Sequence, residues 1–357
     1  MSPAPGPNER RRSLPFWLLG ASAAAAILAP IAWRGSALWR GRHSHARGDG
    51  KRVESYGYDL QPLLVSRATL AAAGLPKDGL RALTDPPLLS AEEMDALHFP
   101  GHGRKPFLVP GDLVIGLTIN GEARAYPVRI MNWHEAANDT LGGEPILVAY
   151  SALCDAIAAF RRAVGGQTLV FGVSGLVSNS NLVLYNRSSG TIGESLWSQL
   201  AEKAIAGTAA RQGLALEALA PQRLRWDEWR ARHPRTTVVA PDPRLMDHYK
   251  RDPYASYYGS DMLRFPVVPL PPAGGMPLKT PTIAASAAGE RRLFDLPWLF
   301  RQADAHGRCA QRLGGAELRF DFGGSPETVS VEAVPPETPL QLIHCFWFAW
   351  HAFHPEP

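Results

Sequence analysis

Two neighbouring residues, His134 and Glu135, combine the side-chain types that metal sites and acid–base catalysis use. They begin the segment HEAAN, which resembles the His-Glu-x-x-His zinc signature except that an amide, a poor zinc ligand, stands in the last position. Two chemistries are open. Either His134 and Asp139 are metal ligands that Cys154 or another histidine completes, or His134 is a general base oriented by a carboxylate. A third interpretation needs no chemistry, because Asn132 and Glu135 have the spacing of a helix capping box.

Further polar residues lie near the ends of predicted strands. Cys154 follows a strand and is either a reactive thiol or a small buried side chain. Ser174 lies in a Gly-Val-Ser-Gly-Leu segment that lacks the second glycine of a nucleophile elbow, so its glycines indicate a bulge or a tight turn. The candidate catalytic residues are His134, Glu135 and Cys154, and the candidate ligand-binding residues are Asn138, Asp139, Ser174, Asn179 and Asn181.

A joint site requires His134 and Cys154 to lie in one pocket. A strand of about seven residues spans roughly 20 Å, so the segment before the strand at 145–151 must fold back along it to bring His134 to its far end. If it does not, the two side chains lie a strand length apart and share no chemistry.

The elements that position these residues are mostly strands. Asn120-Gly121 is typical of a tight hairpin turn between two apolar runs. The sequence predicts an α+β fold that is strand-rich and mostly antiparallel, with short helices. The expected elements are a hairpin of 112–119 with 122–128, a helix over 133–141, a strand at 145–151, a hairpin of 156–164 with 167–175, a strand at 181–186 and a helix over 195–205.

An internal repeat indicates a duplicated unit. WDEWRARHP at 226–234 and WFAWHAFHP at 347–355 both read Trp-x-x-Trp-x-x-x-His-Pro, with the two Trp and the His on one helical face. Each copy follows a Gly-Glu turn with an Arg-containing strand and then a strand led by Gly-Gly. Because a position repeated in two divergent copies is more easily a requirement of the fold than a site, we expect the aromatic residues to pack in the core.

These features divide the chain into four parts. Residues 1–52 form a leader, 53–240 the first and larger half of the duplicated domain, 241–280 a Pro-rich connection, and 281–357 the second, shorter half. In the leader, three arginines precede an uncharged run at 13–33 that is long enough to cross a bilayer. It is a cleaved signal peptide or a retained anchor helix, and the arginine pair before it resembles an export signal. We therefore expect a single-pass membrane protein with its body outside the cytoplasm.

Charge excludes a nucleic-acid partner. The net charge of +4 arises in residues 1–52, which carry nine Lys or Arg against two acidic residues, whereas the other 305 residues carry 28 against 31. No basic stripe is left to follow phosphates. No nucleotide, flavin or haem motif is present, so a metal ion is the cofactor left open, and a small-molecule or protein partner is undefined.

Several segments together resemble the domain of unknown function 3179 family. They are RAYPVRIMNWHEAANDT, LVFGVSGLVSNSNLVLYNR, ESLWSQL and WDEWRARHP, which follow one another in the family's order from about residue 108. Where the family has Cys-Pro-Leu-Cys-Gly, this chain has Ser151 and Asp155 in place of the first Cys and the Gly. Two functions follow as alternatives: a metal- or thiol-assisted enzyme, or a non-catalytic ligand-binding or assembly module whose polar residues build caps and turns.

Overall fold

Strands dominate the structure, a computed structural model that describes residues 47–101, 105–187 and 190–355. They form three large sheets and one small hairpin, and the pairings are antiparallel except β5 with β16 and β2 with β6. The longest α-helices in the described ranges have seven residues. The predicted α+β class, strand-rich and mostly antiparallel, is confirmed among the described residues.

The sheets have the following strand orders. The eight-stranded sheet is β19 (Arg308–Leu313), β20 (Ala316–Phe322), β21 (Val329–Val334), β15 (Gln222–Arg225), β4 (Leu113–Ile119), β5 (Glu122–Pro127), β16 (Thr237–Val239), β3 (Leu88–Ser90). The seven-stranded sheet is β18 (Glu290–Asp295), β17 (Pro281–Ala287), β22 (Leu340–Phe346), β8 (Ala156–Arg161), β7 (Glu144–Ser151), β6 (Ala136–Leu141), β2 (Leu83–Thr84). The five-stranded sheet is β1 (Leu70–Ala72), β11 (Phe171–Ser178), β12 (Asn181–Asn186), β13 (Ser195–Ser198), β14 (Lys203–Gly207), and the small hairpin is β9 (Ala163–Val164) with β10 (Gln167–Thr168).

Short helices join and cover these strands. They are α2 (Ala91–Ala96), α3 (Val128–His134), α4 (Thr208–Arg211), α5 (Trp226–Arg232), α6 (Met246–Tyr249), α7 (Ala255–Tyr258), α8 (Leu296–Gln302) and α9 (Trp347–Phe353). Among the described residues no helix is long and apolar enough to span a membrane. The span predicted at 13–33 lies outside them.

Two stretches of chain have the same order of elements. The first runs β4, β5, α3, β6, β7, β8 and later β15, α5; the second runs β17, β18, α8, β19, β20, β21, β22, α9. Between β8 and β15 the first stretch contains an additional segment, residues 162–221, which supplies most of the five-stranded sheet. This additional segment makes the first stretch the longer one.

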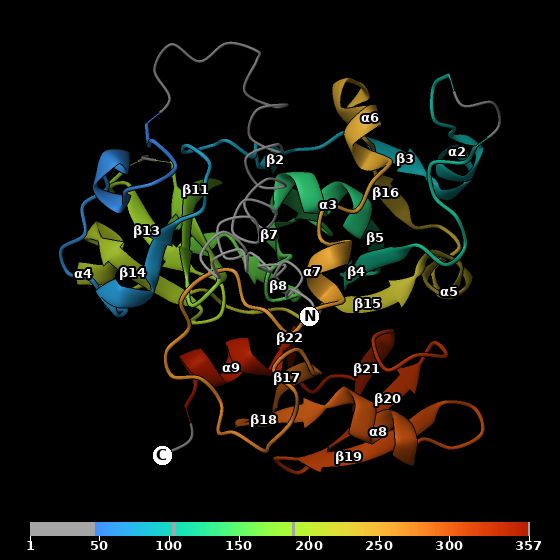
Figure 1. The fold of residues 1–357 in the computed structure, drawn as a ribbon. Helices are drawn as coiled ribbons and strands as arrows, with labels where there is room; N and C mark the ends of the chain where they lie inside the picture. Colours follow the sequence, from blue (N-terminus) through green and yellow to red (C-terminus); the bar gives the residue numbers. More distant parts are fainter. Residues whose placement is uncertain (1–46, 102–104, 188–189, 356–357) are drawn as a thin grey trace, which may run out of the picture.

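The two stretches exchange strands. In the eight-stranded sheet, β21 of the second stretch pairs with β15 of the first, and β20 and β19 follow β21 to the edge of the sheet. In the seven-stranded sheet, β8 of the first stretch pairs with β22 of the second. Figure 1 shows the orange and red strands β17 and β22 next to the green strands β7 and β8. Each of these two sheets therefore contains strands from both stretches.

Several predicted elements are confirmed. The hairpin across Asn120-Gly121 is β4 with β5, the strands at 145–151 and 181–186 are β7 and β12, and both Trp-His-Pro segments form helices. Turn residues and uninterrupted apolar runs carry these predictions, because both act locally.

Two predicted helices are wrong, and one predicted hairpin is confirmed only at its turn. The helix expected over 133–141 ends at His134, and β6 follows it; the helix expected over 195–205 is β13 and β14. Of the hairpin expected for 156–164 with 167–175, only β9 and β10 pair, whereas β8 and β11 lie in different sheets. All of β13 and most of β6 are buried on both faces. A strand buried on both faces shows no alternation of polar and apolar residues, so its sequence does not distinguish it from a helix.

Candidate functional site

The end of α3 and the end of β7 meet at one corner of the seven-stranded sheet. Glu135 follows α3 in the left-handed region, with φ of 58°, and donates its N–H to the Met131 carbonyl at 2.8 Å. Its own carbonyl accepts the N–H of Tyr150 at 2.7 Å. Because β6 runs antiparallel to β7 with Ala136 opposite Ala149, Glu135 reaches the far end of β7. The chain thus folds back along β7, as a joint site requires, but the segment that does so is the strand β6 rather than a helix.

A small cavity of about 40 Å³ lies at this corner, room for a few water-sized groups. Its polar lining includes Glu135 and Ser151, the residue that ends β7. The other lining residues, mostly apolar, are Ala73, Leu75, Leu80, Leu153, Val173, Gly175, Leu176, Val177, Leu182, Tyr254 and Phe265. Neither His134 nor Cys154 is among the lining residues, although each adjoins one that is.

His134 is buried and uses both ring nitrogens. Nδ1 lies 2.7 Å from the carbonyl oxygen of Arg81, and Nε2 lies 2.8 Å from the hydroxyl of Tyr249. A carbonyl accepts only, so Nδ1 carries the proton and Nε2 accepts from Tyr249. Burial raises the pKa of Tyr249, which keeps the hydroxyl a donor. The ring thus connects α3 to the segment before β2 and to α6.

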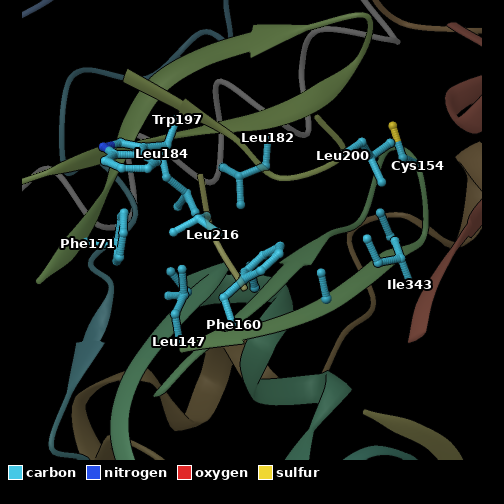
Figure 2. Packing of buried hydrophobic residues seen from close by; sticks show 14 of the residues in the cluster. Leu147, Cys154, Phe160, Phe171, Leu182, Leu184, Trp197, Leu200, Leu216 and Ile343 are labelled. Atoms are coloured by element: carbon cyan, nitrogen blue, oxygen red, sulfur yellow. The ribbon is translucent and has the colours of Figure 1, made fainter. Parts of the chain in front are cut away.

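Cys154 is fully buried in a hydrophobic cluster that includes Leu200 and Ile343, as Figure 2 shows. Burial raises the pKa of its thiol well above the usual range, and nearby Cys345 raises it further. Hydrogen bonds from Asn181 and Ser151 offset part of this rise. The thiolate, which is the nucleophile and the metal-binding form, is therefore strongly disfavoured.

Asn181 belongs to a buried chain of amides. Its Nδ2 donates to Oε1 of Gln199 at 2.9 Å, and Gln199 donates to the carbonyls of Ala149 and Ala156 at 2.9 and 3.0 Å. Oδ1 of Asn181 accepts the N–H of Leu200 at 3.3 Å. These bonds attach the five-stranded sheet to β7 and β8.

The two polar residues of β6 are also held on several sides. Asn138 donates to the carbonyls of Leu83 and Phe171 and accepts the N–H of Phe171 at 2.7 Å. Asp139 accepts from Arg124 and from the hydroxyl of Tyr126, both at 2.7 Å. Partners from β2, β5 and β11 thus satisfy this strand, which explains how polar residues are buried in it.

Ser174 and Asn179 shape β11. Ser174 donates to the carbonyl of Val183 at 2.5 Å and accepts the N–H of Leu176, where the register of β11 against β12 shifts. Asn179, with φ of 48° in the tight turn before β12, accepts the N–H of Val268 at 2.9 Å and donates to the carbonyl of Ala352 at 3.3 Å. Both side chains satisfy backbone groups.

One network was not predicted from the sequence. Asp155, with φ of 45°, pairs with Arg223 of β15 and accepts from the hydroxyl of Tyr150 at 3.1 Å; Tyr150 in turn contacts the hydroxyl of Tyr258 at 3.0 Å. Burial acts to lower the pKa of Arg223, but Asp155, with smaller contributions from Tyr150 and Glu327, raises it overall. The left-handed φ agrees with the glycine of the family pattern at this position. The replacement of that glycine by Asp155 was visible in the sequence, but its partner Arg223 lies 68 residues away along the chain.

Metal ligands do not gather in the described part of the chain. Within residues 47–101, 105–187 and 190–355 no three His, Cys, Asp or Glu side chains are close enough together to hold a metal ion. His134, Asp139 and Cys154, the ligand set left open by the sequence, each contact different partners.

Fold and corner together define a class: a strand-rich α+β protein in which two similar stretches exchange strands and in which a small, mostly apolar cavity lies at the end of β7. The chain belongs to the DUF3179 family of proteins of unknown function, whose family model matches residues 77–357. No curated protein and no solved structure matches the chain.

Proposed function

We propose that the chain is a membrane-tethered, non-catalytic binding module. The observation that supports this proposal is that seven of the eight candidate residues make specific structural contacts: His134, Asn138, Asp139, Cys154, Ser174, Asn179 and Asn181. Residues that perform general acid–base or nucleophilic chemistry need a face directed at the substrate. Here those faces are directed at backbone groups and at neighbouring side chains.

The binding element of this proposal is the corner cavity. Ligand sites are typically apolar with a few polar groups that fix orientation, and Glu135 and Ser151 provide such groups at the end of β7. A volume of about 40 Å³ accommodates the end of a ligand rather than a whole cofactor. The remainder of the ligand would lie along the neighbouring surface.

The tether of this proposal is the uncharged run at 13–33, with the body outside the cytoplasm. Its support is the sequence of the leader and the mild acidity of the other residues. Removal of residues 1–52 is expected to release the body into the soluble fraction, whereas the full chain sediments with membranes. An unprocessed full chain in the soluble cytosolic fraction would contradict the tether.

We further infer that the two similar stretches descend from one duplicated unit. The shared order of elements, the shared Trp-His-Pro helices and the reciprocal strand pairing support this inference. The predicted halves, 53–240 and 281–357, with the Pro-rich connection 241–280 between them, follow this division.

Cysteine alkylation of the native protein tests the non-catalytic assignment. The described part of the chain has three free cysteines: Cys154 and Cys345 are buried, and Cys309 is partly exposed on β19. Treatment of the native full chain with iodoacetamide, followed by mass spectrometry, is expected to modify Cys309 first and to reach Cys154 only after unfolding. Fast modification of Cys154 in the native protein would restore a reactive thiol and overturn the assignment.

A further inference from the structure

The segment between β16 and β17 contains two cationic side chains that lie over the same tyrosine ring. Nζ of Lys279 lies 3.4 Å from the ring centroid of Tyr257, and Cζ of Arg264 lies 4.8 Å from it. Arg264 also lies 5.5 Å from the ring centroid of Tyr254. Aromatic faces attract cations, so Tyr257 holds these two positive charges near each other.

Lys279 has hydrogen-bond partners, whereas one buried donor of Arg264 has none among the described residues. Nζ of Lys279 donates to the carbonyls of Tyr257 and Ser260 at 2.6 and 2.5 Å. Nη1 of Arg264 is shielded from solvent and has no hydrogen-bond partner among the described residues. Burial lowers the pKa of Arg264, and Tyr257 and Tyr258 offset part of this effect.

Three other arginines of the described chain have hydrogen-bond acceptors, although Nε of Arg223, like Nη1 of Arg264, has none. Arg124 pairs with Asp139, Arg223 pairs with Asp155, and Arg162 donates to three backbone carbonyls at 2.7 to 3.0 Å. A guanidinium donor that is removed from water without a partner costs free energy. Arg264 thus has unused capacity to bind an acceptor with negative charge.

We propose that Arg264, together with Lys279, binds an oxyanion, the carboxylate or phosphate group of a small ligand. This inference rests on the proposed function, since it names the chemical class of the ligand that the binding module recognises. A planar guanidinium held by stacking presents its N–H donors in the geometry that suits two oxygens, and an ammonium adds a point charge.

The position agrees with the corner cavity. Tyr254, on which Arg264 stacks, and Phe265, which follows Arg264 in the chain, both line that cavity. An anion at Arg264 therefore lies beside the cavity wall, and the uncharged end of the same ligand can enter between Glu135 and Ser151. One small ligand would contact both features.

Calorimetric titration of the full chain in a neutral detergent at low ionic strength tests this proposal, with inorganic phosphate and acetate as probes. We expect saturable binding of at least one anion, weakened at least tenfold in Arg264→Gln and less in Arg264→Lys. The matched control is Arg301→Gln, an exposed arginine on α8, which should bind as the parent does. Thermal melts of all variants establish that each is folded.

Burial and Arg264 lower the pKa of Lys279 to about 8, which adds a second readout. An anion between the two cations raises that pKa again, so binding at pH 8 should take up protons and give heats that depend on the ionisation enthalpy of the buffer. Absence of saturable binding of both anions, or equal weakening in Arg301→Gln, would overturn the anion site. The alkylation test of Cys154 is independent of either result, so failure of the anion site and failure of the binding-module assignment are distinguishable.

Discussion

The helices α5 and α9 share the Trp-x-x-Trp-x-x-x-His-Pro sequence and have nearly the same geometry, but they differ in how much of each helix is buried. In each, the His N–H that ends the helix donates to the second Trp carbonyl at 2.9 Å, and the two rings lie 4.0 Å apart. The outer residues of α5, such as Arg230 and Ala231, are partly or fully exposed, whereas most of α9 is buried.

The additional segment 162–221 causes this difference. Its sheet covers α9: Asn179 donates to the carbonyl of Ala352, Nε2 of His354 lies 3.0 Å from the carbonyl of Leu200, and Trp350 joins the cluster around Leu182 and Trp197. Nothing equivalent in the described chain covers α5. One sequence motif thus determines the helix, and the neighbouring sheet determines which faces are apolar.

Equivalent positions in the two stretches also differ in size. Leu113 pairs with Arg225, the N-cap of α5, and Pro281 pairs with Phe346, the N-cap of α9. Gly116 of β4 and Ala284 of β17 each lie three residues after that paired residue. A Cβ on Gly116 would lie 2.2 Å from Cζ3 of Trp229. The absence of a side chain at Gly116 therefore lets the Trp229 ring lie directly against the backbone of β4.

Replacement of the second tryptophan of each motif should have the largest effect. Trp229 is 1% exposed and donates from Nε1 to Thr236 at 2.9 Å, whereas Trp350 is 7% exposed. We expect Trp229→Ala to lower the free energy of unfolding by about 4–5 kcal/mol and Trp350→Ala by about 3 kcal/mol. Chemical denaturation followed by circular dichroism measures both, with the exposed Trp298→Ala as control. Unchanged stability in either variant would move that residue from the core to the surface.

Two turns each bring an acidic residue to Arg223: the turn between β7 and β8 carries Asp155, and the turn between β20 and β21 carries Glu327. Substitutions in these two turns should differ almost as much in their effect on stability. Asp155 from the first turn is buried beside Arg223, whereas Glu327 from the second lies 3.6 Å away with a 55% exposed side chain. Asp155→Asn should cost about 3–4 kcal/mol, because it leaves a buried charge without its partner. Glu327→Gln should cost less than about 1 kcal/mol. Equal losses of stability in the two variants would contradict this distinction.

Acid should lower the stability of the protein through His344, which has the same position in β22 as Arg223 has in β15. Burial, together with the charge of Arg223, lowers the pKa of His344 to about 4, although the hydrogen bond to the Pro221 carbonyl acts in the opposite direction. Between pH 6.5 and 4 the unfolded chain binds more protons at this residue, so stability should fall as the pH falls through this range, by about 3 kcal/mol at most. Denaturation at several pH values measures the slope. His344→Gln should flatten it, and an unchanged slope would exclude this residue as the cause.

The smallest effects concern the strand positions under the tryptophans. Gly116→Ala should cost about 2 kcal/mol because it overpacks the site against Trp229. Ala284→Gly should cost about 1 kcal/mol through backbone entropy and a lost methyl contact. Thermal melts compare the two. A neutral Gly116→Ala variant would show that the Trp229 ring can move.

Candidate residues were easier to find from the sequence than to interpret. Of the candidate residues, only Glu135 lines the cavity at the end of β7, and the others contact separate partners. The sequence predicts a helix for Asn138 and Asp139, which lie in β6, because nothing local shows that a strand is buried on both faces. The partners of the candidate residues, such as Tyr249 for His134, are distant in the chain.

By itself the sequence determined what short-range chemistry controls: the Asn120-Gly121 turn, the apolar strands β7 and β12, the repeated Trp-His-Pro helices, and membership of the family. Only the tertiary structure decided how the two stretches exchange strands, that Asp155 meets Arg223, and that one buried donor of Arg264 is left without an acceptor among the described residues. The physical reason is that hydrogen bonding and burial of polar groups are satisfied by partners far along the chain. Local propensity carries no information about which of these distant groups will meet.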